Sequence, residues 1–219
     1  MLPCIEIETG PNPANCVIWL HGLGADGHDF EPVVPLLGLS PGPGVRFVFP
    51  HAPAREVTVN GGMVMRAWYD IRHIDLSREE DEPGIRTSQD AVEALIQREA
   101  TRGIAPEKMV LAGFSQGGAM ALQTGLRQAA RIAGIVALSA YLPLAGTVAQ
   151  ERNPANAEVP IFLGHGLHDP VVPFAMGTAS RDRLRELGHP VSWHEYRLPH
   201  SVSLDELRDV GSWLSHRLR

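Results

Sequence analysis

A Gly-x-Ser-x-Gly pentapeptide stands between a strand-like run and a helix-like stretch of this chain. It occupies residues 113–117, with the apolar residues 109–112 before it and residues 118–125 after it. A sharp turn from a strand into a helix strains the central serine and lifts its hydroxyl clear of the sheet. Because glycine has no Cβ atom, the two arms of such a turn can pass close together. We therefore expect Ser115 to be a nucleophile; a serine in an ordinary glycine-rich turn is the alternative.

A serine hydroxyl is a weak nucleophile without a base, and the chain has 10 histidines. In enzymes with this turn, the partners follow in the order Ser, Asp or Glu, His. His200 follows the strand-like residues 191–196 and precedes the last expected helix, so its loop can reach the serine. His189, His194 and His216 fit less well, because they fall in a turn, a strand and a terminal helix. We expect His200 to be the base, with a surface-loop histidine as the alternative.

Asp169 is the candidate acid between the serine and the histidine. It follows the apolar residues 159–164 and precedes a proline. One expected helix, at about residues 174–187, and one strand separate it from His200. That length of chain returns to the next loop on the same edge of a parallel sheet. Asp169 is therefore expected to orient His200.

A metal site is the rival interpretation of the residues around Asp169. His165 and His168 stand close enough in the sequence to share an ion with it. A closed site needs a further ligand, and none is evident, while the end of the strand explains Asp169 without metal. We expect no metal and no cofactor.

An oxyanion needs two N–H donors, and a second glycine-rich loop can supply one of them. Residues 20–27 read Leu-His-Gly-Leu-Gly-Ala-Asp-Gly after the strand-like residues 16–20. Such a loop after an early strand contributes one donor, and the residue after the nucleophile contributes the other. We expect Leu23 and Gln116 to provide these N–H groups. His21 is better explained as a structural residue of the loop than as a proton-transfer residue.

Five ordered motifs together resemble the phospholipase/carboxylesterase family of α/β-hydrolases. They are residues 20–27, 67–71 (Ala-Trp-Tyr-Asp-Ile), 113–118 (Gly-Phe-Ser-Gln-Gly-Gly), 165–173 and 199–202. The family includes acyl-protein thioesterases and bacterial carboxylesterases. The resemblance implies Ser115, Asp169 and His200 as the triad, and Leu23 and Gln116 as the oxyanion hole. Leu198–Pro199 departs from the small residue pair expected before the histidine.

Apolar runs alternate with helix-like stretches along the chain, which predicts an α/β fold. The expected strands include an edge strand at Ile5 and Ile7 and short buried strands at residues 45–49 and 134–138. Ser203 and Glu206 match a capping box that opens the last helix. Its expected buried stripe is Leu204, Leu207, Val210, Leu214 and Leu218. The pattern indicates one α/β-hydrolase domain, residues 1–219, with a mostly parallel central sheet and helices on both faces.

Charge and cysteine content exclude several classes of protein. A formal net charge of −6 without a basic run argues against a nucleic-acid partner. Cys4 and Cys16 make no disulfide framework, and free thiols suit a reducing cytosol. The first residues do not resemble a signal peptide. No stretch approaches the roughly 20 apolar residues of a membrane span. We expect a cytoplasmic protein without stable membrane insertion.

The segment from residue 51 to residue 83 is the least regular, and long loops are usually functional. We expect Met63, Val64, Met65 and Trp68 to border an acyl pocket, since adjacent apolar side chains need a core or a ligand to cover them. Gly61–Gly62 would let the loop move. Packing as a satellite core is an equal alternative. Asp70 is expected to be a structural hydrogen-bond acceptor.

These features predict a serine hydrolase that cleaves short- to medium-chain carboxylic esters through an acyl-enzyme. Its substrates are then small acyl esters. An acyl-protein thioesterase acting on acylated proteins and a lysophospholipase acting on lysophospholipids are the alternative enzymes. A non-catalytic binding protein on the same fold is the alternative outside enzymes. The sequence leaves open whether the protein is a monomer or a homodimer.

Overall fold

The apolar runs form one central sheet in the computed structural model, which describes residues 1–39, 42–73, 75–76 and 79–218. The sheet has seven strands in the order β1-β3-β2-β6-β7-β8-β9. Their bounds are β1 Cys4–Glu8, β2 Asn15–Leu20, β3 Val45–Pro50, β6 Met109–Phe114, β7 Gly134–Leu138, β8 Ile161–Gly166 and β9 Val191–Tyr196. The edge strand β1 is antiparallel to β3, and the other neighbouring strands are parallel. The predicted α/β fold with a mostly parallel sheet is confirmed.

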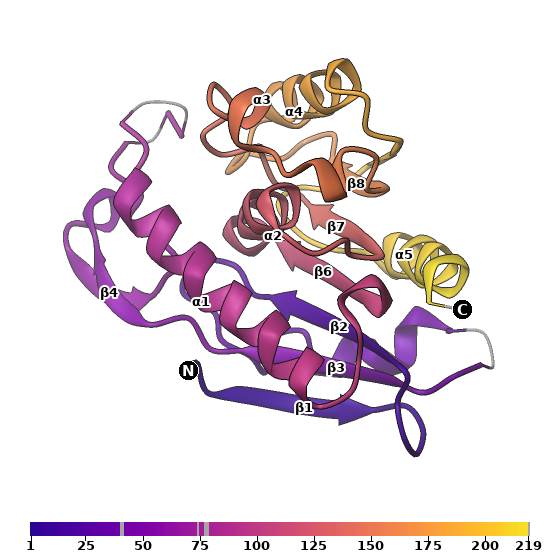
Figure 1. The fold of residues 1–219 in the computed structure, drawn as a ribbon. Helices are drawn as coiled ribbons and strands as arrows, with labels where there is room; N and C mark the ends of the chain where they lie inside the picture. Colours follow the sequence, from indigo (N-terminus) through magenta and orange to yellow (C-terminus); the bar gives the residue numbers. More distant parts are fainter. Residues whose placement is uncertain (40–41, 74, 77–78, 219) are drawn as a thin grey trace.

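Helices cover both faces of the sheet (Figure 1). Helices α1 (Glu82–Thr101), α2 (Gln116–Arg127) and α4 (Phe174–Glu186) pack on one face, with the short α3 (Val148–Glu151) beside them. Helix α5 (Leu204–Arg217) packs on the other face with the 3-10 helix η1 (Glu31–Leu37). Because neither face meets water, every residue of β2, β7 and β8 is buried.

The predicted capping box opens α5. The Ser203 hydroxyl accepts a hydrogen bond from the Glu206 N–H at 3.2 Å. The buried stripe contains Leu207, Val210 and Leu214. The prediction was wrong for Leu204, which is 44% exposed, because this first residue of α5 lies to one side of the buried Leu207 and Val210 around the helix.

The segment expected to be irregular contains a β-hairpin. Strands β4 (Ala54–Val57) and β5 (Met63–Arg66) pair antiparallel, and the 3-10 turn η2 (Thr58–Asn60) lies between them. Gly61 and Gly62 have positive φ angles of 67° and 78°, so the glycine pair serves the turn of the hairpin. Asp70 accepts hydrogen bonds from the N–H and the hydroxyl of Thr58 at 2.7 and 2.6 Å, which confirms its structural role.

The topology places a crevice at the carboxyl ends of β2 and β6. From β2 the chain moves to β3 on one side, whereas β6 and the later strands build the sheet on the other side. Open α/β sheets bind ligands where the strand order reverses in this way. The loops that follow β2 and β6 carry the two glycine-rich motifs of the sequence.

The cysteines and the helices bear on the expected compartment and on the expected absence of a membrane span. Cys4 and Cys16 are both free thiols. Among the described residues, no helix combines the length and the apolar character that a membrane crossing needs.

Candidate active site

Ser115 occupies a strained turn between β6 and α2. Its φ and ψ angles are 55° and −122°, a conformation that side-chain-bearing residues rarely adopt. A Cβ atom on Gly113 would overlap the carbonyl of Gly117, and one on Gly117 would overlap the carbonyl oxygen of Leu20. Only glycine therefore fits at both positions, and the turn has the form of a nucleophile elbow.

The imidazole of His200 lies between a hydroxyl and a carboxylate. Its Nε2 atom is 2.9 Å from Ser115 Oγ, and its Nδ1 atom is 2.7 Å from Asp169 Oδ2. The three residues follow β6, β9 and β8 at the same edge of the sheet. The ring of Phe114 packs against the imidazole at a centroid distance of 4.7 Å. The structure thus brings together the three residues that the sequence analysis singled out.

The Asp169 carboxylate is buried and held by its own loop. Its Oδ1 atom accepts hydrogen bonds from the N–H groups of Val171 and Val172 at 2.8 and 2.9 Å. The Oδ2 atom is thereby left facing His200. Two backbone donors fix the carboxylate, so it can hold the Nδ1 proton of the imidazole in place.

His165 lies beside this carboxylate without joining it in a hydrogen bond. Its Nε2 atom is 3.7 Å from Asp169 Oδ2 and 2.9 Å from the carbonyl oxygen of Val172. Burial lowers the pKa of His165, so the ring is neutral and donates to that carbonyl. Within the described part of the chain, no group of three or more His, Cys, Asp or Glu side chains could hold a metal ion.

Leu23 and Gln116 both line the cavity in front of Ser115. Across the residues that the structure describes, neither backbone N–H has a protein acceptor, so both can donate to a substrate oxygen. The Leu23 loop is fixed on both sides. His21 Nε2 accepts from the Ala52 N–H at 3.0 Å, and the Gly24 N–H donates to the Arg66 carbonyl at 2.8 Å.

His21 is a structural residue of this loop, as expected. Its Nδ1 atom lies 2.7 Å from the carbonyl oxygen of Gly22. Since Nε2 accepts a hydrogen bond, Nδ1 carries the proton of the neutral ring. Burial lowers the pKa of His21, which keeps the ring neutral at physiological pH.

Trp68 is a support of the loops and does not line the cavity, which corrects the sequence-based assignment. Its side chain is 0% exposed, and its indole N–H donates to the His21 carbonyl at 2.9 Å. The backbone N–H of Trp68 donates to Gln116 Oε1 at 2.9 Å, and Gln116 Nε2 donates to the Tyr69 carbonyl at 2.8 Å. A buried indole needs an acceptor, and here the acceptor is in the first glycine-rich loop. Because the backbone N–H of Trp68 is bonded to Gln116, Trp68 links the two glycine-rich loops.

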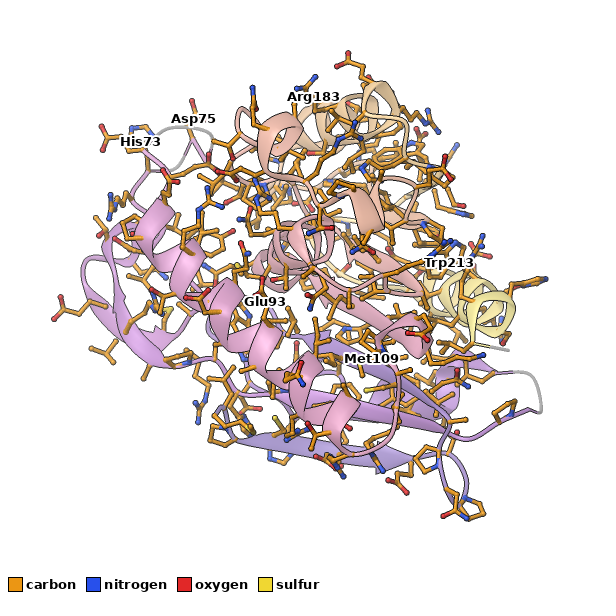
Figure 2. All side chains as sticks on the ribbon, in the orientation of Figure 1. His73, Asp75, Glu93, Met109, Arg183 and Trp213 are labelled. Carbon is orange, nitrogen blue, oxygen red and sulfur yellow. The ribbon has the colours of Figure 1, made fainter. Side chains whose placement is uncertain are left out.

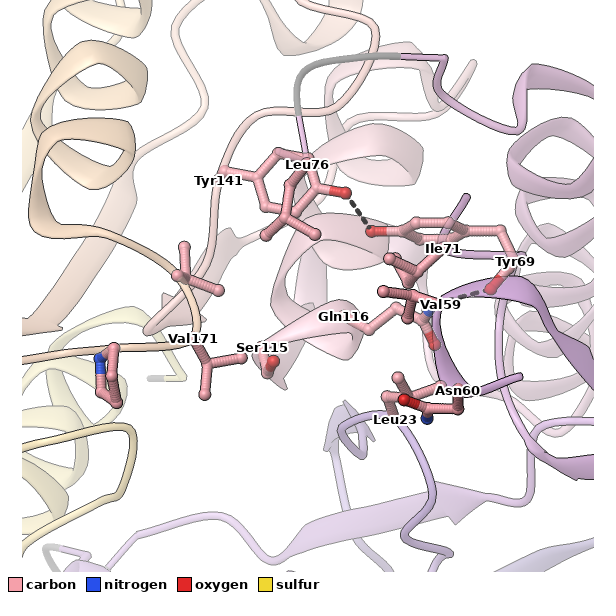
Figure 3. Close-up of a pocket in the computed structure, with 12 residues that line it drawn as sticks. Leu23, Val59, Asn60, Tyr69, Ile71, Leu76, Ser115, Gln116, Tyr141 and Val171 are labelled. Carbon is pink, nitrogen blue, oxygen red and sulfur yellow. Dashed lines mark hydrogen bonds between the residues drawn. The ribbon is translucent and has the colours of Figure 1, made fainter. Parts of the chain in front are cut away.

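An apolar cavity of about 260 Å³ opens beside Ser115 (Figure 3). Tyr69 and Tyr141 lie on one side of it, and Leu23 and Asn60 lie on the other. The remaining lining residues are Val59, Ile71, Leu76, Gln116, Pro170, Val171 and Val172. Three of them belong to the Asp169 loop, so the cavity and the polar cluster share one wall.

Met63, Val64 and Met65 do not line this cavity, contrary to expectation. Met63 and Val64 are each 63% exposed on β5, because the hairpin presents this strand to solvent. Met65 is half-buried and accepts a weak hydrogen bond from Asn60 at 3.3 Å.

The sequence analysis missed most of the residues that do line the cavity. Tyr141 follows the carboxyl end of β7, and Val171 follows the candidate acid. Their position after strand ends is the signal that could have identified them. Val59, Ile71 and Leu76 carry no such signal, because only the packing of the hairpin region brings them to the cavity.

Residues 2–218 match the phospholipase/carboxylesterase family. The chain belongs to this family. It is 44% identical to acyl-protein thioesterase 1 of Neurospora crassa over 92% of this chain and 86% of that protein. It is 38% identical to acyl-protein thioesterase 1 of Cryptococcus neoformans over 98% of each chain. This phospholipase/carboxylesterase family member is therefore a hydrolase, and the family resemblance inferred from its five motifs is confirmed.

Solved structures agree with the family. The crystal structure of Arabidopsis thaliana SOBER1 has a TM-score of 0.87 and 32% identity, and covers 94% of this chain and 99% of its own. The crystal structure of Zea mays acyl-protein thioesterase 2 has a TM-score of 0.82 and 29% identity, and covers 98% of this chain and 99% of its own. Both support the α/β-hydrolase fold of this family member.

Proposed function

We propose that the protein hydrolyses carboxylic esters and thioesters of short to medium acyl chain length, with Ser115 as nucleophile. One observation carries the proposal. His200 bridges Ser115 Oγ and Asp169 Oδ2 at 2.9 and 2.7 Å beside an apolar cavity. A hydroxyl, an imidazole and a carboxylate in this order form an activated nucleophile.

The first half of the reaction forms an acyl-enzyme. Ser115 Oγ attacks the acyl carbon while its proton passes to His200 Nε2, and Asp169 stabilises the resulting imidazolium through Nδ1–H. The N–H groups of Leu23 and Gln116 donate to the oxyanion of the tetrahedral intermediate. The bond to the leaving group then breaks, and His200 returns the proton to the departing alcohol or thiol.

The second half of the reaction releases the acid. His200 Nε2 accepts a proton from water, whose oxygen attacks the acyl carbon of the ester on Ser115. The same two N–H groups stabilise the second oxyanion. When the Ser115–acyl bond breaks, the proton on His200 returns to Oγ, and the carboxylic acid leaves. Every atom in both halves comes from the substrate, water or these residues.

Acylated proteins are the second substrate class that we propose, on the basis of the relatives of this chain. The fungal relatives are acyl-protein thioesterases, and the same nucleophile serves esters and thioesters. Lysophospholipids remain the alternative. We place the protein in a reducing compartment, since Cys4 and Cys16 are both free thiols and disulfides are characteristic of oxidising compartments.

A matched panel of acyl substrates tests the proposal. Purified protein and the Ser115→Ala variant are incubated with p-nitrophenyl esters and acyl-thioesters of two to about sixteen carbons. We expect turnover of both classes by the native protein, and at most about a thousandth of that rate in the variant. Binding of acyl compounds without turnover would favour the non-catalytic alternative, and equal turnover by the two proteins would contradict the role of Ser115.

A further inference from the structure

Tyr141 lines two neighbouring cavities. The first is the cavity of about 260 Å³ beside Ser115. The second has a volume of about 510 Å³ and lies between α4 and the segment after β7. Its wall is apolar at Ala175, Met176 and Ala179, and it carries ionisable side chains at Glu80 and Arg183. Figure 2 shows Arg183 on α4. Tyr141 therefore borders both the space in front of Ser115 and a second, larger space that reaches the surface at the exposed Ala175 and Ala179.

Hydrogen bonds fix both the side chain of Tyr141 and the backbone of the residue that follows it. The Tyr141 hydroxyl lies 2.9 Å from the hydroxyl of Tyr69 (Figure 3), and the two residues are 5% and 2% exposed. The next residue, Leu142, donates its N–H to the hydroxyl of Ser180 on α4 at 2.8 Å. Burial raises the pKa of Tyr141 to about 12 and also raises the pKa of Tyr69, so both hydroxyls stay protonated and one donates a hydrogen bond to the other. Burial and these hydrogen bonds together hold the Tyr141 ring in one position.

We infer that Tyr141 is a specificity-determining residue that ends the acyl cavity and thereby limits the length of the acyl chain. The inference rests on the proposed function. The first cavity, of about 260 Å³, takes the first carbons of an acyl chain. A longer chain reaches Tyr141, and its further carbons must stay in solvent. The apolar side of the second cavity would receive them if the ring were absent.

The test compares Tyr141→Ala with Tyr141→Phe across esters of four to about sixteen carbons. The readout is the ratio of kcat/KM for the dodecanoyl ester to kcat/KM for the butanoyl ester, so a general loss of activity cancels. Each newly buried methylene should raise kcat/KM up to about fourfold. We expect the ratio to rise at least tenfold in Tyr141→Ala and to stay within about twofold of the native value in Tyr141→Phe, which keeps the ring.

Filling the second cavity supplies the control. Ala179→Phe should leave the native ratio unchanged, but should cancel the gain when it is combined with Tyr141→Ala. Tyr141→Leu, which keeps an apolar core residue, replaces Tyr141→Ala if thermal unfolding shows that the alanine variant does not fold. An unchanged ratio in the folded small-residue variant, or a gain that survives Ala179→Phe, would overturn the inference. Failure of the native protein to turn over any ester would instead overturn the proposed function.

Discussion

The side-chain amide of Gln116 is hydrogen-bonded to the backbone of Trp68. Gln116 Oε1 accepts the Trp68 N–H at 2.9 Å, although 48 residues separate them. The neighbouring Tyr69 carbonyl accepts Gln116 Nε2–H at 2.8 Å. Since the Trp68 indole also holds the His21 carbonyl, this contact joins the loops that carry the two candidate oxyanion donors.

Replacing Gln116 by alanine should affect stability and catalysis together. The change leaves the buried N–H of Trp68 and carbonyl of Tyr69 without partners, which costs about 1–3 kcal/mol of unfolding free energy. It keeps the backbone N–H of residue 116, so the loss of kcat/KM should come from loosened loops. Denaturant unfolding and ester kinetics measure the two effects. Gln97→Ala, on the exposed face of α1, is the control, and a Gln116→Ala protein as stable as this control would refute the bridging role.

Asp169→Asn should impair catalysis while leaving the fold in place. The amide can still accept the Val171 and Val172 N–H groups, but it cannot stabilise the His200 imidazolium. By analogy with other Ser-His-Asp enzymes, kcat should fall by about 10⁴. Asp182→Asn, an exposed carboxylate on α4, is the matched control. A loss of only a few-fold in Asp169→Asn, measured on a folded protein by circular dichroism, would exclude Asp169 as the acid.

The fold was largely predictable because its signals are local. Buried strands are short apolar runs, and the elbow needs glycine at residues 113 and 117 whatever the rest of the chain does. The order of Ser115, Asp169 and His200 followed from strand ends on one edge of a parallel sheet. The cavity was not predictable in the same way. An apolar run such as residues 63–65 does not reveal whether tertiary structure will cover it.

Val59 and Met63 form a matched pair that tests whether Val59, and not β5, borders the acyl cavity. Val59 lines the cavity, whereas Met63 is 63% exposed on β5. Val59→Ala removes apolar contact from the acyl chain, so kcat/KM for an octanoyl ester should fall about fourfold while the acetyl ester changes little. Met63→Ala should leave both substrates within about twofold. A larger effect of Met63→Ala than of Val59→Ala would restore the original expectation for β5.

Glu206 should make the stability of the protein depend on pH. It is 1% exposed, and burial raises its pKa from 4.5 to about 8, with the Asp209 carboxylate adding to the rise and the Ser203 N–H opposing it. The folded state therefore binds the proton more tightly than the unfolded chain. This stabilisation is full below about pH 4.5 and is lost as the pH rises through about 8.

Glu206→Gln removes this titration. Between pH 5 and pH 9, the unfolding free energy of the native protein should fall relative to the variant by up to about 4 kcal/mol. Asp205→Asn, at an exposed carboxylate in the same helical turn, should follow the native protein. Parallel pH curves for native and Glu206→Gln proteins in urea unfolding would show that Glu206 ionises normally.

The central claim is that His200 activates Ser115 for covalent catalysis. Mass spectrometry after treatment with a fluorophosphonate measures this directly, because the reagent phosphonylates only an activated serine hydroxyl. We predict one adduct per chain, located on Ser115 by peptide mapping, no adduct in Ser115→Ala, and labelling at least a hundredfold slower in His200→Ala. An adduct on another serine, or labelling of Ser115 at the native rate in His200→Ala, would contradict the account.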